Sequence, residues 1–169
     1  MIEFNYFKSP IGSLSILAIK EGVVKISFEN ESREKIEKWC KNYLGMGIVV
    51  GSDFTSSAKD QILNYLSGKR KSLEFPVVHF NSLFRKKVLE VERKISYGET
   101  RSYGVVAQMV NCPRASRAIG SANANNPLPL YFPCHRIIKS NGELGKFRGG
   151  KKVKQYLIDL ERKIDKHTL

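Results

Sequence analysis

The sequence lacks the features that mark secreted, membrane-spanning and metal-binding proteins. No apolar run approaches the roughly 20 residues that a membrane-spanning helix needs. Residues 1–4 show neither the basic start nor the apolar middle of a signal peptide. The chain has 3 cysteines, an odd number without a Cys-x-x-Cys pair, which indicates neither a disulfide framework nor a zinc site. We therefore expect a cytoplasmic protein with free thiols and no bound metal.

Negative charge is scarce, above all in the second half of the chain. The 169 residues carry a net charge of +13. Residues 1–77 hold 11 Lys/Arg against 9 Asp/Glu, a net of +2, whereas residues 78–169 hold 18 against 7, a net of +11. Such a basic half is typical of proteins that bind a polyanion such as DNA. A basic surface that serves solubility alone is the alternative.

The first 77 residues predict a small α+β domain. Two β-rich runs, Leu14–Ile19 and Val23–Phe28, flank a hairpin turn, and Leu73–Phe80 predicts a further strand. Apolar residues at helical spacing predict helices around residues 36–43 and 58–66. No residue in this part suggests chemistry.

Residues 78–169 predict a mostly helical domain. Capping residues and apolar spacing predict four helices. They begin after Asn81 or Ser82, after Ser102, at about residue 114 (running to about 122) and near Lys151. The face of the last helix that we expect to be buried carries Val153, Leu157, Leu160 and Ile164.

Two short helices joined by a tight turn are typical of a helix-turn-helix. The second one is rich in Ala, Ser and Gly, and small side chains let a helix backbone approach a narrow DNA groove. Close packing against a neighbouring helix is the alternative explanation of these small residues. Arg117 stands on the polar face of this helix. Its predicted apolar face carries Ala115, Ala118, Ile119 and Ala122.

The tetrapeptide Pro133–Arg136 brings together a thiol, a base and a cation. A thiol attacks as the thiolate, and its ordinary pKa of about 8.5 leaves it mostly protonated. His135 can accept the proton of Cys134, and Arg136 together with the surrounding positive charge can stabilise the thiolate. Neighbours on an extended chain point to opposite sides, so His135 needs a bridging water and a carboxylate that orients its other nitrogen. Spacing leaves four such carboxylates open: Glu143, Asp159, Glu161 and Asp165.

Five segments stand in a fixed order along the second half of the chain. They are Ile95–Gly104, Arg117–Gly120, Asn126–Pro129, Pro133–Ile138, and Ser140–Gly145 together with Gly149–Gly150. Together they resemble the O6-alkylguanine-DNA alkyltransferase family over about residues 82–164, while the first 77 residues match only in length and style. The resemblance implies an α/β protein of two domains. Residues 1–77 would form a supporting ribonuclease-H-like domain, and residues 78–169 a winged helix-turn-helix domain that binds DNA and accepts the alkyl group.

The resemblance also implies the roles of the catalytic residues. Cys134 would be the alkyl acceptor, and His135, oriented by Glu161, would activate it through a water. Asn126 would tie the turn before the active-site segment. Tyr103 would help to rotate the nucleotide out of the duplex and would donate to the flipped base.

The recognition helix would enter the minor groove of DNA, with Arg117 as a finger that fills the place of the flipped base. The other residues of this helix region that would contact DNA are Ala115, Ser116, Ala118 and Gly120. The sequence departs from the family pattern at Leu130–Phe132 and Lys146–Arg148, which bears on the size of the alkyl group accepted.

The function that follows is repair of double-stranded DNA containing O6-alkylguanine by irreversible transfer of the alkyl group to Cys134. A thioether bond is not readily broken, so each monomer would react only once. The reaction would need no metal and no diffusible cofactor, and the protein would not bind a membrane. Three alternatives stay open. A non-catalytic module that binds alkylated DNA would lack the acceptor cysteine, a cysteine hydrolase would turn over, and an ordinary helix-turn-helix regulator would need no reactive thiol.

Overall fold

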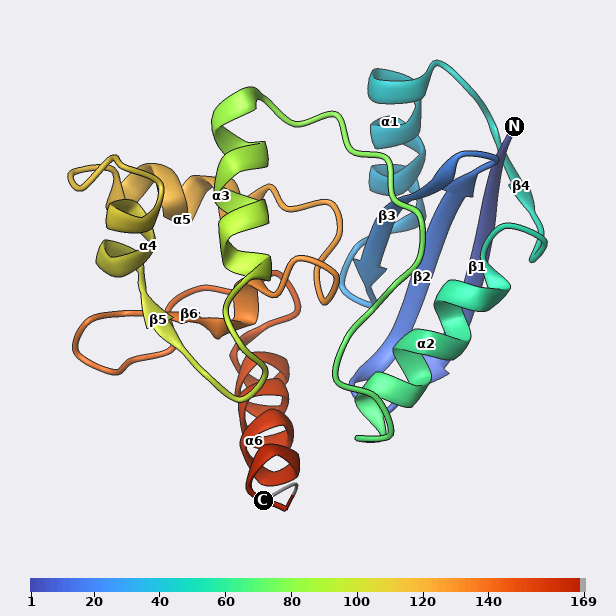
Figure 1. Ribbon diagram of the computed structural model, residues 1–169. Coiled ribbons are helices and arrows are strands. Elements are labelled where there is room, and N and C mark those ends of the chain that lie inside the picture. The colour runs from blue at the N-terminus through green and yellow to red at the C-terminus, as the bar shows by residue number, and fades with distance from the viewer. Residues whose placement is uncertain (168–169) are drawn as a thin grey trace. The chain divides into compact units, whose positions relative to one another are not determined.

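The computed structural model describes residues 1–167. The chain divides into two compact units, Met1–Phe80 and Asn81–Leu169, whereas the sequence placed this boundary after residue 77. The first unit holds a sheet and two helices, and the second holds the other described helices and a two-stranded sheet (Figure 1). The predicted fold class, a mixed α/β protein with a helical C-terminal part, is confirmed. Within the described residues, no helix is long and apolar enough to cross a membrane.

A four-stranded sheet with the order β3-β2-β1-β4 forms the first unit. The strands β1 (Ile2–Ser9), β2 (Gly12–Ile19) and β3 (Gly22–Phe28) are antiparallel neighbours, and β4 (Ile48–Val50) pairs parallel to β1. The pair β2–β3 is the predicted hairpin. Six consecutive residues of β2 are buried, which requires cover on both faces of the sheet.

Two helices supply this cover from opposite sides of the sheet (Figure 1). They are α1 (Arg33–Leu44) and α2 (Ser56–Leu66), as the apolar spacing predicted. Ser32 caps α1 by accepting a hydrogen bond from the backbone of Lys35. Cys40 lies on the buried face of α1 in the hydrophobic core, so this thiol is structural.

The prediction of a strand over Leu73–Phe80 is wrong. The segment makes one isolated bridge, in which Val23 N donates to Pro76 O and Val78 N donates to Val23 O, both at 2.9 Å. Pro76 has no N–H with which to continue a ladder. Gly22 permits the close approach, because a Cβ there would lie 2.6 Å from Pro76 O.

Three helices pack together around the core of the second unit. They are α3 (Leu83–Arg93), α4 (Tyr103–Met109) and α5 (Ser116–Ala124). As predicted, Ser82 caps α3 and Ser102 caps α4. The fully or nearly fully buried core comprises Val88, Ile95, Val106, Ala107, Val110, Ile119, Ala122 and Ile137.

The helix α5 differs from its prediction at its start and on its buried face. It begins at Ser116, because residues 113–114 form a turn rather than a first helical turn. Ile119 and Ala122 are buried as predicted, but Ala118 is exposed. The small residue at 118 therefore belongs to the outer face that carries Arg117.

A short irregular region joins α5 to the last helix. It contains a single turn of 3-10 helix, η1 (Cys134–Arg136), and the strand β6 (Ile137–Ile138), which pairs parallel to β5 (Arg101–Ser102). The predicted turn at residues 139–142 follows, closed by a hydrogen bond from Gly142 N to Lys139 O. The chain then enters α6 (Lys151–Lys166).

The predicted buried face of α6 is confirmed only at Leu157, which is fully buried. Val153, Leu160 and Ile164 are half-buried. The fully or nearly fully buried residues are Lys154, Leu157, Ile158 and Glu161. The apolar spacing did not predict the burial of Lys154 and Glu161, because it cannot detect the polar partners that these two charged residues have inside the unit.

Candidate active site

A loop with three prolines in residues 127–133 leads from α5 to Cys134, and Asn126 braces it. The Asn126 Nδ2 atom donates to Phe132 O at 3.0 Å and to the Cys134 Sγ atom at 3.3 Å. Its Oδ1 atom accepts a hydrogen bond from Leu128 N at 2.9 Å. Because Asn126 is itself buried, these bonds fix the sulfur relative to the end of α5.

The Cys134 thiol is buried and protonated at rest. Burial raises its pKa to about 12, and the negative charge of Glu92 acts in the same direction. The hydrogen bond from Asn126 and the positive charges of Lys154 and Arg148 act to lower this pKa. The sulfur therefore needs a proton acceptor before it can attack as a thiolate.

His135, which follows Cys134 in the sequence, contacts a carboxylate in the interior of the second unit. Its Nε2 atom lies 2.7 Å from the Glu161 Oε1 atom, and both side chains are buried. Of the four carboxylates that spacing left open, Glu161 is the one in contact with His135. Burial lowers the pKa of His135 even though the Glu161 charge opposes this, so the imidazole is neutral. A carboxylate only accepts hydrogen bonds, so Nε2 carries the hydrogen and Nδ1 is the basic nitrogen.

Two further groups hold the Glu161 carboxylate. The Arg136 Nε atom and the Gly98 backbone N each donate to Glu161 Oε2 at 2.9 Å. Burial alone would raise the pKa of Glu161, but its contacts with His135 and Arg136 hold that pKa well below its usual range. Glu161 is therefore a buried anion with a full set of donors.

The expectation that Arg136 stabilises the thiolate is wrong. Successive side chains of a 3-10 turn point in directions about a third of a turn apart, and that of Arg136 points to Glu161. The positive charges that act on the Cys134 sulfur come instead from Lys154 and Arg148.

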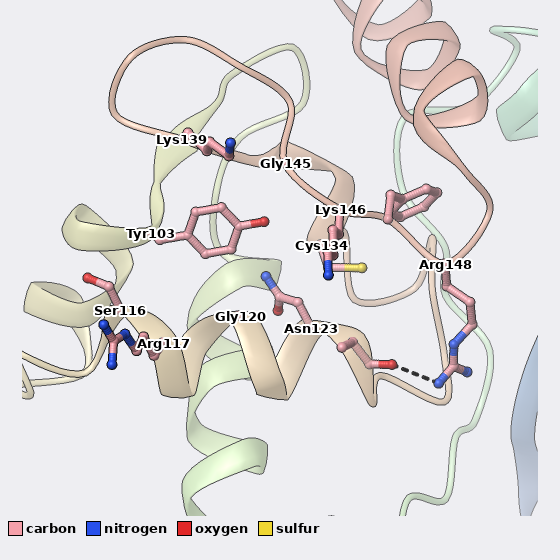
Figure 2. Close-up of a pocket in the computed structure, with 12 residues that line it drawn as sticks. Tyr103, Ser116, Arg117, Gly120, Asn123, Cys134, Lys139, Gly145, Lys146 and Arg148 are labelled. Atoms are coloured by element: carbon pink, nitrogen blue, oxygen red, sulfur yellow. Dashed lines mark hydrogen bonds between the residues drawn. The ribbon is translucent and has the colours of Figure 1, made fainter.

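Cys134 lies in the wall of a cavity of about 560 Å³. The walls come from α4, α5, the η1 turn and the loop over residues 139–148 (Figure 2). The lining residues are Tyr103, Ser116, Arg117, Gly120, Asn123, Ala124, Cys134, Lys139, Gly145, Lys146, Phe147 and Arg148. Arg148 also anchors its loop to the end of α5, because its Nη2 atom donates to Ala124 O at 2.9 Å (Figure 2).

Tyr103, at the start of α4, reaches into this cavity (Figure 2). Gly145 leaves room for this side chain, because a Cβ there, where φ is +72°, would lie 2.9 Å from the Tyr103 hydroxyl. A Cβ at Gly120 would lie 4.0 Å from the ring, which is an ordinary contact. Burial raises the pKa of Tyr103, so its hydroxyl keeps its proton and can donate a hydrogen bond.

The residues expected to contact DNA divide into two groups. Ser116, Arg117 and Gly120 line the cavity, and Arg117 is exposed near the N-terminal end of α5 (Figure 2). Ala115 precedes the helix as its N-cap, and Ala118 is exposed, and neither lines the cavity.

The remaining thiols stand apart from this chemistry. Burial raises the pKa of Cys40 to about 11, and Cys112 is half-buried against the core of the second unit. Among residues 1–167, no three His, Cys, Asp or Glu side chains gather in a way that could hold a metal ion. Cys134 is thus the thiol that lines the cavity.

Sequence reasoning missed two charged residues of the site, although their spacing holds a signal. Lys154 falls seven residues before Glu161, on the side of α6 that also carries Leu157. Glu92 falls between Val88 and Ile95 on the apolar side of α3 and is fully buried. Both residues could have been found from the sequence, because each is a charged residue at a helix position where the pattern predicts an apolar one.

Two family models match successive parts of the chain. The 6-O-methylguanine DNA methyltransferase, ribonuclease-like domain matches residues 2–78, and the DNA binding domain of the same name matches residues 83–163. The chain belongs to the 6-O-methylguanine DNA methyltransferase family. The resemblance drawn from the five segments is confirmed, and it extends to the first unit, where the sequence matched only in style.

Curated relatives agree with this membership in the methyltransferase family. The constitutive methylated-DNA–protein-cysteine methyltransferase of Bacillus subtilis is 40% identical over 162 residues, which cover 94% of this chain and 96% of the relative. The corresponding protein of Methanosarcina acetivorans is 35% identical over 161 residues, which cover 94% and 97%. Among solved structures, Mycobacterium tuberculosis OGT in complex with DNA matches with a TM-score of 0.84 at 28% identity, and the match covers 96% of this chain and 94% of that one.

Proposed function

We propose that this methyltransferase repairs O6-alkylguanine in duplex DNA by moving the alkyl group to the Cys134 sulfur. The main support is the position of the Cys134 thiol, which lies in the wall of a cavity and accepts a hydrogen bond from Asn126. The next residue in the sequence, His135, is paired with Glu161. The curated relatives bear the name of the same activity. A binding module without catalysis would not need a nucleophile in this setting.

Proton removal from Cys134 is the first step. The neutral His135 takes the thiol proton through a bridging water on its Nδ1 atom, and the Glu161 anion stabilises the imidazolium that forms. The thiolate is held by the Asn126 amide and by the positive charge of Lys154. A buried thiol with a high resting pKa thus becomes a nucleophile only with help from its neighbours.

Transfer then makes one bond and breaks another. The thiolate attacks the alkyl carbon, a carbon–sulfur bond forms, and the bond between that carbon and guanine O6 breaks. The electron pair passes to the guanine, which takes up a proton, and the Tyr103 hydroxyl donates a hydrogen bond to the base as it leaves. The thioether on Cys134 has no easy leaving path, so each chain reacts once and needs no diffusible cofactor or metal.

The base must leave the DNA stack to reach this sulfur. A volume of about 560 Å³ falls within the range of about 300–1,000 Å³ that is usual for small-molecule pockets. The exposed Arg117 stands beside the cavity on a helix of small residues and can fill the vacated place in the duplex. Ala115 and Ala118 allow close approach of this helix to the minor groove.

We propose that the first unit is a supporting domain and that the second unit carries the DNA-binding surface and the alkyl acceptor. Residues 1–77 carry a net charge of +2, against +11 for residues 78–169, so the attraction for DNA comes mainly from the second unit. We propose that the protein acts as a monomer in the cytoplasm, where reducing conditions keep Cys134 a free thiol.

A peptide-mass experiment tests the transfer directly. After incubation with a duplex containing O6-methylguanine, we expect one added methyl group on the peptide that contains Cys134. Cys134→Ser should abolish the mass gain, because an alcohol is a far weaker nucleophile at neutral pH. Cys112→Ser removes a thiol outside the cavity and should leave the gain intact. An unmodified Cys134 peptide together with DNA binding would favour the non-catalytic binding module.

Arg117→Ala tests the proposed flipping of the base. We expect repair of the lesion in duplex DNA to slow by about tenfold or more, because nothing fills the vacated place, while reaction with the free O6-methylguanine base changes little. Arg114→Ala removes an equal charge from the turn before α5, outside the cavity, and should affect both substrates weakly. Equal slowing of both reactions in Arg117→Ala would contradict the role given to this residue.

A further inference from the structure

Glu92 is a buried carboxylic acid that the mechanism above does not use. It lies on α3, and its side chain is fully buried. The helix α3 packs against α5 and also against the η1 turn that carries Cys134. Glu92 therefore lies in the part of the second unit that supports the sulfur.

The neighbours of Glu92 come from each element packed around it. Asn123 on α5 lies close enough to lower the pKa of the Glu92 carboxyl, and the charges of Lys154 on α6, Cys134 on η1 and Tyr103 on α4 interact with it. Asn123 also lines the cavity, between Tyr103 and Cys134 in Figure 2. A negative charge on Glu92 thus raises the pKa of both the nucleophile and the cavity tyrosine.

Neither Glu92 nor Asn123 completes its hydrogen bonding among the described residues. Both carboxyl oxygens of Glu92, and both polar atoms of the Asn123 side chain, are buried and meet the geometry of no hydrogen bond there. Lys154 differs, because its Nζ atom donates to Ile137 O at 2.5 Å. A buried carboxyl group without hydrogen bonds to its oxygens is unfavourable in its anionic form.

We propose that Glu92 and Lys154 act as a buried, electrostatically coupled pair that sets the charge beside the Cys134 sulfur, with Glu92 as a positioning residue for alkyl transfer. The pair carries one positive charge while both members are protonated and none after the loss of one proton. Glu92 gives up this proton, so the change in charge beside the sulfur comes from its carboxylate. The inference deepens the proposed function, because it explains how thiolate formation depends on a residue that touches neither DNA nor alkyl group.

The titration of the pair places this change near neutral pH. Burial raises the pKa of Glu92 to about 8 and lowers that of Lys154 to about 8. Below this range the acid is neutral, and the Lys154 charge favours the thiolate. Above it, a Glu92 anion disfavours the thiolate, and its effect on the pKa of Cys134 exceeds that of Lys154. Glu92→Gln keeps the shape of the neutral acid and removes the negative form.

Alkylation of Cys134 by iodoacetamide, an uncharged reagent, measures the thiolate without any need for DNA. We expect Glu92→Gln to match the wild type within about twofold at about pH 6.5 and to exceed it by roughly fivefold at about pH 9. Glu90→Gln removes a carboxylate from the exposed side of α3 and should follow the wild type throughout. The rates are read from the mass of the Cys134 peptide, so that Cys40 and Cys112 do not contribute.

Thermal unfolding supplies a second measurement. An acid whose pKa is raised on folding loses stability as pH rises from its unfolded value of about 4.5 to its folded value of about 8. The melting temperature of Glu92→Gln should therefore rise relative to the wild type over this interval, and that of Glu90→Gln should not. A pH-independent difference would show a structural role alone and would overturn the inference.

Repair of O6-methylguanine in the same variants separates this inference from the proposed function. Normal methyl transfer by the wild type, with identical iodoacetamide profiles for Glu92→Gln and Glu90→Gln, would overturn the inference and leave the proposed function standing. A shifted iodoacetamide profile without methyl transfer by the wild type would support the charge pair and overturn the proposed function.

Discussion

Glu161 combines complete burial with a full negative charge, and the residues around it explain how. Arg136 and His135 lie on the same short turn as Cys134, and both donate to this carboxylate. The carboxylate in turn keeps His135 oriented with its basic nitrogen available. The Glu161 side chain thus neutralises the buried Arg136 and also orients His135.

Glu161→Gln should destabilise the protein, because it leaves the Arg136 guanidinium buried without a counter-charge. We expect a loss of about 3 kcal/mol in the free energy of unfolding near neutral pH. The pKa of Glu161 is held below its ordinary value, so its contribution is fully present above about pH 4.5 and disappears as the pH falls toward the folded pKa. The gap between variant and wild type should therefore narrow in acid.

Chemical denaturation at several pH values measures this difference. Asp159→Asn is the matched control, since Asp159 is exposed on the same helix and its side chain accepts a hydrogen bond from Gln155. It should change stability by no more than about 0.5 kcal/mol. A Glu161→Gln variant as stable as this control would show that the buried pair is dispensable.

At the scale of elements, the loop over residues 139–148 forms one wall of the cavity. Its conformation depends on glycines, because Gly142 and Gly145 both have positive φ. They differ in their surroundings. A Cβ at Gly145 would meet the Tyr103 hydroxyl at 2.9 Å, whereas one at Gly142 would meet nothing within 4 Å. This pair separates backbone strain from contact with the cavity tyrosine.

Gly145→Ala and Gly142→Ala should each lose roughly 1–2 kcal/mol of stability from the left-handed backbone. Gly145→Ala alone should also slow alkyl transfer, by about tenfold, because the added methyl group displaces Tyr103 from the cavity. The measurement is the single-turnover rate of both variants on a lesion-containing duplex, beside their melting temperatures. Equal rates would mean that the position of Tyr103 does not limit the reaction.

The sequence predicted the elements well where local rules govern them. Caps such as Ser82 and Ser102 and the hairpin of β2 and β3 follow from local patterns. The buried face of α6 did not, because Lys154 and Glu161 are buried through partners far away in sequence. A hydrophobicity pattern counts charges as exposed and has no means to see such partners.

The candidate site shows the same division between local and long-range information. The proposed nucleophile and base, Cys134 and His135, were evident from the sequence, and family resemblance selected Glu161 from four carboxylates. The orientation of Arg136 was missed, since it depends on a turn of 3-10 helix that Pro133 precedes. Glu92 was missed because a single charge within an apolar face is easily taken as solvated.

At the scale of the whole molecule, the two parts of the chain differ in net charge. This difference indicates which part attracts DNA and how that attraction assists the reaction. Residues 78–169 carry nearly all of the net positive charge and also the cavity with Cys134. A reaction that needs an extruded base gains from a surface that holds the phosphates on either side. The family models assign the DNA binding domain to this same part of the chain.

The number of lesions repaired per chain tests the central claim that Cys134 is the final acceptor. With a large excess of O6-methylguanine duplex, we expect restored guanine to rise to one equivalent per protein chain and then stop. The methyl group should be recovered on the Cys134 peptide. Continued repair beyond one equivalent, or a plateau without methyl on that peptide, would contradict the account.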